Sequence, residues 1–127
     1  MTVGVLLISH TDIAQALFNT VNKIWNDTPL TCDWLEIAFD EDPKKATDAL
    51  RKKINLLDSG DGVLILTDLA GATPGNIVKT ITHHNLSVVS GLNLPMLMKI
   101  YNYTNKTLAE LTTLSIEGGK NGITTVE

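Results

Sequence analysis

Three short stretches of the chain are apolar at almost every position, whereas a fourth alternates. The continuous stretches are Val3 to Ile8, Gly62 to Leu66, and Leu86 to Val89. Strands that are apolar on both faces belong inside a parallel sheet covered by helices on each side. In the fourth stretch, Leu35, Ile37 and Phe39 alternate with a mixed set of residues. This alternation predicts an edge strand with one face less buried.

Helical periodicity and helix-start signals fill the gaps between these strands. From Asp12 to Trp25, apolar residues recur at three- and four-residue spacing. An N-cap residue followed by proline at the first helical position opens two further helices. One starts at Asp42-Pro43 and runs through Leu57, and the other starts at Thr73-Pro74.

The last third of the chain predicts two more helices and a final strand. Pro95 starts a short helix, and Thr107 with Glu110 forms a capping box for a longer one. We expect Gly118-Gly119 to end that helix and residues 121–127 to form a short strand. The order β-α-β-α-β-α-β-α-α-β predicts an α/β fold with three layers around a doubly wound sheet.

Composition narrows the class of protein. The chain has 127 residues, of which 43% are apolar. This predicts a single globular domain that spans residues 1–127. No apolar run approaches the roughly 20 residues that span a bilayer, and the start lacks the basic region of a signal peptide. The single cysteine, Cys32, favours the cytosol. A net charge of −4, with Arg51 as the only arginine, argues against nucleic-acid binding.

Two polar residues stand where the chemistry of such a sheet is expected. His10 directly follows the first apolar stretch, and Asp68 directly follows the second. In open α/β sheets, active positions lie beyond the carboxyl ends of the strands. If the two strands are neighbours, about 4.8 Å apart, the carboxylate reaches an imidazole nitrogen. Asp68 then fixes the tautomer and leaves the other nitrogen nucleophilic, although a histidine at a strand end is, taken alone, more often a loop or capping residue.

The segment after Asp68 adds an anion-binding signal. The helix starting at Thr73-Pro74 offers free backbone N–H groups near the same edge of the sheet. Gly71 permits a close approach of the backbone to a ligand. The Thr73 hydroxyl can either cap its own helix or donate to a phosphoryl oxygen. We expect His83 and His84 to face solvent at the end of a helix, and we predict no metal site.

Three ordered motifs make the sequence resemble a known family. They are VLLISH at 5–10, GDGVLILTDL at 60–69 followed by Gly71 and Thr73-Pro74, and GLNLPML at 91–97. Over essentially the whole chain, the sequence resembles the mannose-type enzyme IIA of the bacterial phosphoenolpyruvate:sugar phosphotransferase system.

The resemblance implies a cytoplasmic phosphoryl carrier without a cofactor. His10 would accept the phosphoryl group from the phosphocarrier HPr and pass it to a IIB protein or domain, which serves the membrane subunits IIC and IID. Asp68 would orient His10, and Gly71, Ala72 and Thr73 would face the phosphoryl group. The resemblance also implies four parallel strands in the order 2-1-3-4. It further implies a homodimer in which the antiparallel strand at 121–127 crosses to the partner's sheet.

The chain departs from the family pattern at two places. Thr11-Asp12 follows the histidine where the family favours two glycines, and Asp12 either repels a phosphoryl group or caps the first helix. Ala70 and Ala72 replace an aromatic residue and a glycine after Asp68, and we expect Ala72 to resist a positive φ.

Three other functions remain open, the first of them because of the altered turn at Ala70 and Ala72. The first is a regulatory module that is phosphorylated at His10 and signals by binding a protein. The second is the phosphotransfer subunit of a dihydroxyacetone kinase, and the third is a ligand-binding or structural domain in which His10 is inert.

Overall fold

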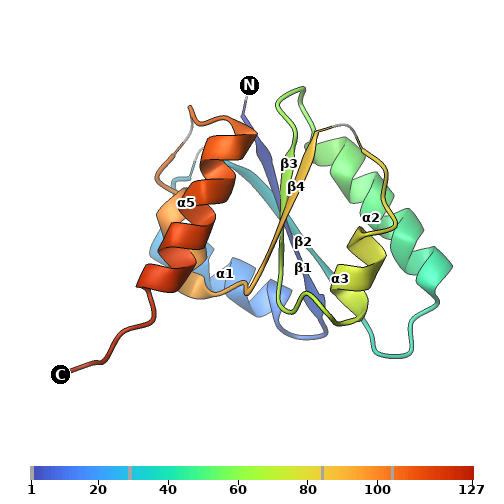
Figure 1. Cartoon of the computed structure of the whole chain (residues 1–127), viewed down its shortest axis with the longest axis horizontal. Helices are drawn as coiled ribbons and strands as arrows, with labels where there is room; N and C mark the ends of the chain where they lie inside the picture. The colour runs from blue at the N-terminus through green and yellow to red at the C-terminus, as the bar shows by residue number, and fades with distance from the viewer. Residues whose placement is uncertain (1, 29, 84, 104) are drawn as a thin grey trace.

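Four parallel strands in the order β2-β1-β3-β4 form the sheet at the centre of this computed structural model (Figure 1). The strands are β1 (Gly4–His10), β2 (Thr31–Ile37), β3 (Val63–Thr67) and β4 (Leu86–Ser90). The structure describes residues 2–28, 30–83, 85–103 and 105–127. The predicted α/β class and the strand order 2-1-3-4 are thereby confirmed.

Helices cover both faces of the sheet and complete three layers (Figure 1). The helices are α1 (Ala14–Ile24), α2 (Pro43–Leu57), α3 (Thr73–Val78), α4 (Leu94–Ile100) and α5 (Leu108–Asn121). Successive side chains of a strand point to opposite faces. Val5 and Leu7 therefore pack with α1, α4 and α5, whereas Leu6 and Ile8 pack with α2 and α3. None of the helices described is long and apolar enough to cross a membrane.

The edge strand β2 is shorter than its alternation predicts. It ends at Ile37, and a turn follows in which the Glu41 backbone N–H donates to the Ala38 carbonyl over 3.1 Å. The Glu41 carboxylate accepts a bond from the Ala38 N–H over 3.3 Å, which holds the turn closed. The expectation that Phe39 continues the buried face is wrong, because the turn lifts it off the sheet and leaves it 80% exposed.

Helix α5 continues through the two glycines that were expected to end it. Its last residue is Asn121, so the predicted stop at Gly118-Gly119 is wrong. A Cβ atom on Gly118 would lie 2.3 Å from the Cβ atom of Lys99 in α4. The glycines therefore let α5 approach α4 closely, and the packing gained there outweighs their low helix propensity of about 1 kcal/mol each.

Residues after α5 form no strand in this single chain. Gly122 is the C-cap of α5, and the tail that follows extends away from the body of the molecule (Figure 1). Ile123 and Val126 are 79% and 96% exposed. The predicted strand at 121–127 is therefore not confirmed, and Asn121 belongs to α5 instead.

The prediction that His83 faces solvent is wrong, because the structure leaves this residue partly buried. Helix α3 ends at Val78, and the chain then folds back so that His83 Nε2 lies 2.6 Å from Asp58 Oδ2. The other oxygen of Asp58 accepts bonds from the N–H groups of Gly60 and Gly62. The bond from His83 and these backbone bonds lower the pKa of Asp58. The pair stabilises the turn that leads into β3. His84 lies outside the described residues.

Candidate active site

His10 and Asp68 meet at the carboxyl edge of the sheet. His10 is the last residue of β1, and Asp68 directly follows β3. The two strands are parallel neighbours, with Ile8 opposite Thr67. The register places the two side chains at the same end of adjacent strands, as the strand-end argument expects.

The geometry of this pair defines the state of the imidazole ring. His10 Nδ1 lies 2.7 Å from Asp68 Oδ2, and the same oxygen accepts the His10 backbone N–H over 3.1 Å. The second carboxylate oxygen accepts the Leu69 N–H over 2.9 Å. A carboxylate only accepts, so Nδ1 carries the proton and Nε2 keeps its lone pair. No described residue forms a hydrogen bond with Nε2.

The pair is largely screened from solvent and the carboxylate is ionised. The side chains of His10 and Asp68 are 17% and 12% exposed. Burial is the largest single influence on the Asp68 carboxyl and raises its pKa, but the bonds from His10 and Leu69 together outweigh it. The net result is a lowered pKa. Asp68 therefore brings a full negative charge to the buried side of the ring.

An aromatic ring from another loop covers one face of His10. The Phe39 ring stacks on the imidazole with ring centroids 4.8 Å apart and planes inclined by 27°. Sequence reasoning missed Phe39 as a site residue because it was assigned to the strand. The β1–β2 register could have indicated it, since His10 lies opposite Ile37 and Phe39 stands two residues further on. An aromatic ring is thus present at the site although Ala70 supplies none.

The turn between His10 and α1 has a different construction from the one expected. Asp12 has a φ of +73°, a left-handed conformation that costs a non-glycine residue about 1 kcal/mol or more. Asp12 does not cap α1, whose N-cap is Ile13. Instead Ser9 Oγ accepts the Ala14 N–H over 2.8 Å, and the Glu36 carboxylate accepts the Gln15 N–H over 2.9 Å.

The segment after Asp68 leads into α3 without using Thr73 as a cap. The N-cap is Ala72, with an ordinary φ of −101°, so the expected conflict with a positive φ does not arise. The Ala72 N–H donates to the Leu69 carbonyl over 3.3 Å. Thr73 is the first helical residue, so its hydroxyl does not cap the helix. Nothing lies within 4 Å of a Cβ atom placed on Gly71, which leaves room for a ligand beside it.

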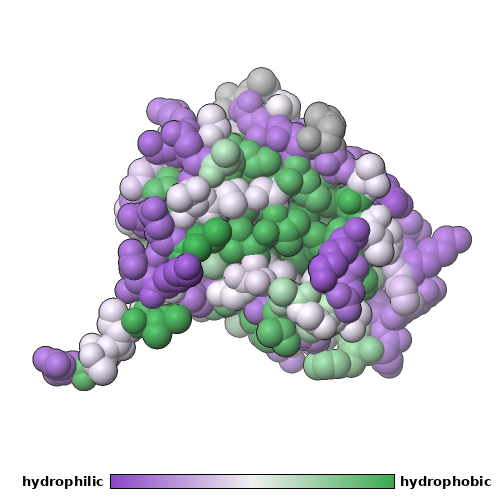
Figure 2. All heavy atoms as spheres, viewed as in Figure 1, coloured by the Kyte–Doolittle hydropathy of each residue, from purple (hydrophilic) through white to green (hydrophobic). Residues whose placement is uncertain are grey.

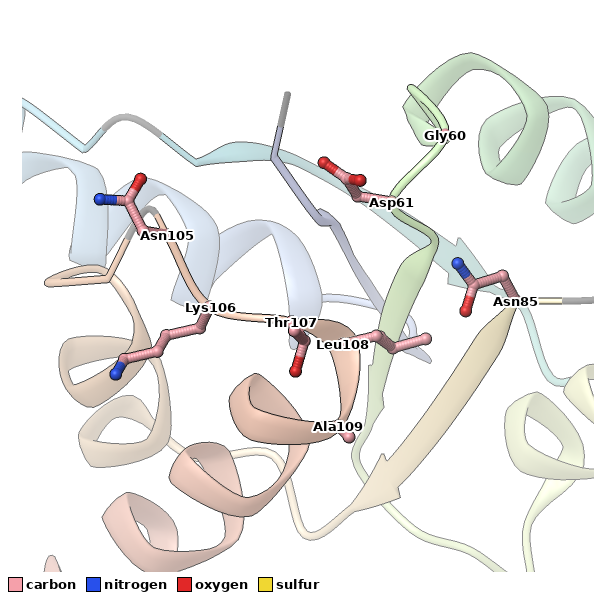
Figure 3. A pocket seen from close by; sticks show the side chains of 8 residues that line it. All are labelled: Gly60, Asp61, Asn85, Asn105, Lys106, Thr107, Leu108 and Ala109. Carbon is pink, nitrogen blue, oxygen red and sulfur yellow. The ribbon is translucent and has the colours of Figure 1, made fainter.

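A separate hollow lies at the opposite end of the sheet. It has a volume of about 610 Å³ and lies between the starts of β3, β4 and α5, as Figure 3 shows. At the start of α5, the side chains of Thr107 and Glu110 accept each other's backbone N–H groups in a capping box. Asp61 adds a negative charge to the rim. This hollow includes neither His10 nor Asp68.

Residues 4–114 match the family EIIA-man, described as the PTS system fructose IIA component. The chain belongs to this family. It is a mannose-type enzyme IIA, a component of a sugar phosphotransferase system. The strand-end histidine and aspartate described above fall within the matched segment.

Known proteins similar to this enzyme IIA agree with the assignment. The mannose-specific EIIAB component of Escherichia coli K12 is 24% identical over 127 residues, covering 97% of this chain and 39% of that protein. The chain therefore spans well under half of that relative.

Solved structures share the fold of this enzyme IIA. The mannose/sorbose specific IIA subunit from Enterococcus faecalis has a TM-score of 0.86 at 23% identity, covering 100% of this chain and 96% of that one. The EIIA component from Streptococcus agalactiae has a TM-score of 0.82 at 21% identity, with 97% and 96% covered. At these identities the likeness establishes the fold.

Proposed function

We propose that this enzyme IIA is a cytoplasmic phosphoryl carrier that accepts a phosphoryl group on Nε2 of His10. The donor is the phosphocarrier HPr, and the acceptor is a IIB protein or domain that serves the membrane subunits IIC and IID. The observation that carries the proposal is the 2.7 Å contact between His10 Nδ1 and Asp68. That contact fixes the proton on Nδ1 and leaves the lone pair on Nε2.

The transfer step requires no metal or cofactor to activate the donor. Nε2 attacks the phosphorus of the donor phosphohistidine in line, and the donor P–N bond breaks as the new one forms. The His10 ring gains positive charge in this step because Nδ1 keeps its proton. The buried Asp68 carboxylate stabilises that charge.

We assign the phosphoryl oxygens to the turn formed by Gly71, Ala72 and Thr73. Two observations support this assignment: the Thr73 hydroxyl is not consumed in capping α3, and the space beside Gly71 is open. Since the Ala72 N–H already donates to Leu69, Ala72 contributes by shaping the turn rather than by donating to the phosphoryl group.

Phosphorylation from purified components tests the proposal directly. The full chain, incubated with phosphoenolpyruvate, enzyme I and HPr, is expected to gain an acid-labile, base-stable phosphate. His10→Ala is expected to gain none, because the nucleophile is gone. His83→Ala is the matched control, since His83 is also paired with an aspartate but lies at the other end of the sheet, and it is expected to be labelled normally.

The outcomes distinguish the competing functions. An unlabelled wild-type chain, or an equally labelled His10→Ala chain, contradicts the proposal. A label that returns to HPr but that no IIB protein accepts indicates a regulatory module instead. Transfer of the label from His10 to the other subunits of a dihydroxyacetone kinase, but not to IIB, indicates the phosphotransfer subunit of such a kinase.

We further propose that two copies of the chain form a homodimer through the open edge of β4. Val88 on this strand is 45% exposed, and hollows of about 390 and 220 Å³ lie beside the strand. Figure 2 shows apolar side chains gathered over the middle of this face, where β4 lies in Figure 1. An unpaired, apolar strand edge is a template for another strand, and the exposed tail carrying Ile123 and Val126 fits it.

Removing the tail tests the dimer. The full chain is expected to sediment as a dimer at micromolar concentration, and a chain ending at Gly122 as a monomer that keeps its helical circular dichroism. Leu56→Ala, at a residue on α2 that is 84% exposed, is the control and is expected to remain dimeric. A full chain that is monomeric at all concentrations, or a shortened chain that still dimerises, contradicts the proposal.

A further inference from the structure

Phe39 occupies a position that the fold itself does not require. Its side chain is 80% exposed, and it belongs to neither of the two apolar clusters that flank the sheet. A large apolar side chain gains little stability when most of it stays in water. The contact that the structure does give it is the His10 ring, at a centroid separation of 4.8 Å.

The chain around Phe39 holds it in this place from both sides. On one side, Ile37 pairs with His10 in the β1–β2 ladder. On the other, the turn from Ala38 to Glu41 is closed by a backbone bond of 3.1 Å and by the Glu41 carboxylate on the Ala38 N–H. The turn therefore projects Phe39 over the end of the neighbouring strand, where His10 stands.

We infer that Phe39 is a positioning residue that fixes the plane of the His10 ring for phosphoryl transfer. The inference rests on the proposed function of His10. The bond from Nδ1 to Asp68 anchors one edge of the imidazole ring, but a single in-plane bond leaves the ring free to swing about it. Aromatic rings stacked at such a centroid separation attract each other, and this attraction restricts that swing.

Fixing the plane of the ring directs the reactive lone pair. In-line transfer needs Nε2 aligned with the phosphorus atom and the leaving nitrogen, and small displacements of a reacting group are costly. The electron pair of Nε2 forms the new N–P bond, and the donor imidazole leaves with the pair of the broken one.

Replacing Phe39 with leucine separates this role from simple apolar contact. Phe39→Leu keeps an apolar side chain but removes the flat ring. We expect the maximal rate of phosphoryl uptake from HPr to fall by roughly tenfold, with little change in the KM for HPr. Phe39→Tyr is expected to restore the rate to within about twofold, since it keeps the ring.

Two further variants serve as controls for docking and for surface effects. Leu69→Ala removes an apolar side chain that is 61% exposed and directly follows Asp68. It is expected to change KM rather than the maximal rate if it contacts HPr. Leu56→Ala, remote on α2, is expected to change neither. A Phe39→Leu chain that changes only KM, or that matches the wild-type rate, overturns the positioning role.

Nuclear magnetic resonance of the unphosphorylated chain tests the contact independently of any transfer. The Phe39 ring current is expected to shift the His10 ring-proton signals, and Phe39→Leu is expected to abolish that shift while Phe39→Tyr keeps it. If no chain is labelled but the shift is present, the proposed function fails and the contact stands. If labelling is normal and the shift is absent in the wild type, the inference about Phe39 fails alone.

Discussion

Replacing Asp68 with asparagine is expected to slow phosphoryl transfer to His10 by roughly 10²- to 10³-fold, the usual effect of losing one electrostatic partner of a charged transition state. Both oxygens of Asp68 accept N–H groups, from His10 on one side and Leu69 on the other. Whichever way the asparagine amide turns, its NH₂ group faces a donor. The negative charge that stabilises the phosphorylated ring is lost in both orientations.

Single-turnover labelling from phosphorylated HPr measures this loss. Because the folded-state pKa of Asp68 lies below its ordinary value of 3.8, the carboxylate stays charged above that value. Its contribution is lost only as the pH falls through the lowered pKa. Titration of Asp68 itself is therefore expected to add no pH dependence to the ratio of wild-type to variant rates between about pH 5 and 9.

The second histidine–aspartate pair provides the matched control for Asp68→Asn. Asp58→Asn changes a similar pair with His83 at the other edge of the sheet and is expected to leave the transfer rate unchanged. An Asp68→Asn rate equal to that of the wild type removes Asp68 from the mechanism. Equal losses in both variants point to a general effect on the fold.

Gly118→Ala is expected to lower the free energy of unfolding by about 1–3 kcal/mol, the usual range for overpacking a core. The new Cβ atom would lie 2.3 Å from the Lys99 Cβ atom and 3.3 Å from the Pro95 carbonyl oxygen. On an open helix surface the same change would stabilise the protein by about 1 kcal/mol. The sign of the effect thus reports whether α5 packs on α4 at this residue.

Urea denaturation followed by circular dichroism gives the sign and the size. Gly71→Ala is the control, because nothing lies within 4 Å of its added Cβ atom, and it is expected to change stability by less than about 0.5 kcal/mol. A Gly118→Ala chain that is as stable as the wild type, or more so, contradicts the close packing of α4 and α5.

Local signals in the sequence predicted most of the fold. The apolar stretches mark the inner strands, and the helix-start signals at Asp42-Pro43 and Thr107 with Glu110 appear in the structure as caps. The same reasoning placed His10 and Asp68 at one edge, because the ends of adjacent parallel strands must meet there.

Features that depend on contacts between distant segments escaped sequence reasoning. Gly118 reads as a helix stop unless Lys99 is known to lie against it. Phe39 continues an alternating pattern that only the turn closed by Glu41 interrupts. His83 follows a helical pattern, and its partner Asp58 lies 25 residues earlier in the chain. In each case tertiary packing overrides a local preference.

The turn between His10 and α1 depends on a residue of β2, which is synthesised later than the turn itself. Helix α1 has no capping side chain at its N-cap; Glu36, which satisfies one of its first N–H groups, lies 21 residues beyond Gln15. During synthesis from the N-terminus, the turn next to His10 is therefore completed only after β2 has emerged and paired with β1. Phe39 lies two residues beyond the end of β2 and is synthesised directly after that strand. Under the proposed function, a phosphoryl label on His10 is therefore expected only on chains in which β2 has paired with β1, so the same label also reports on folding.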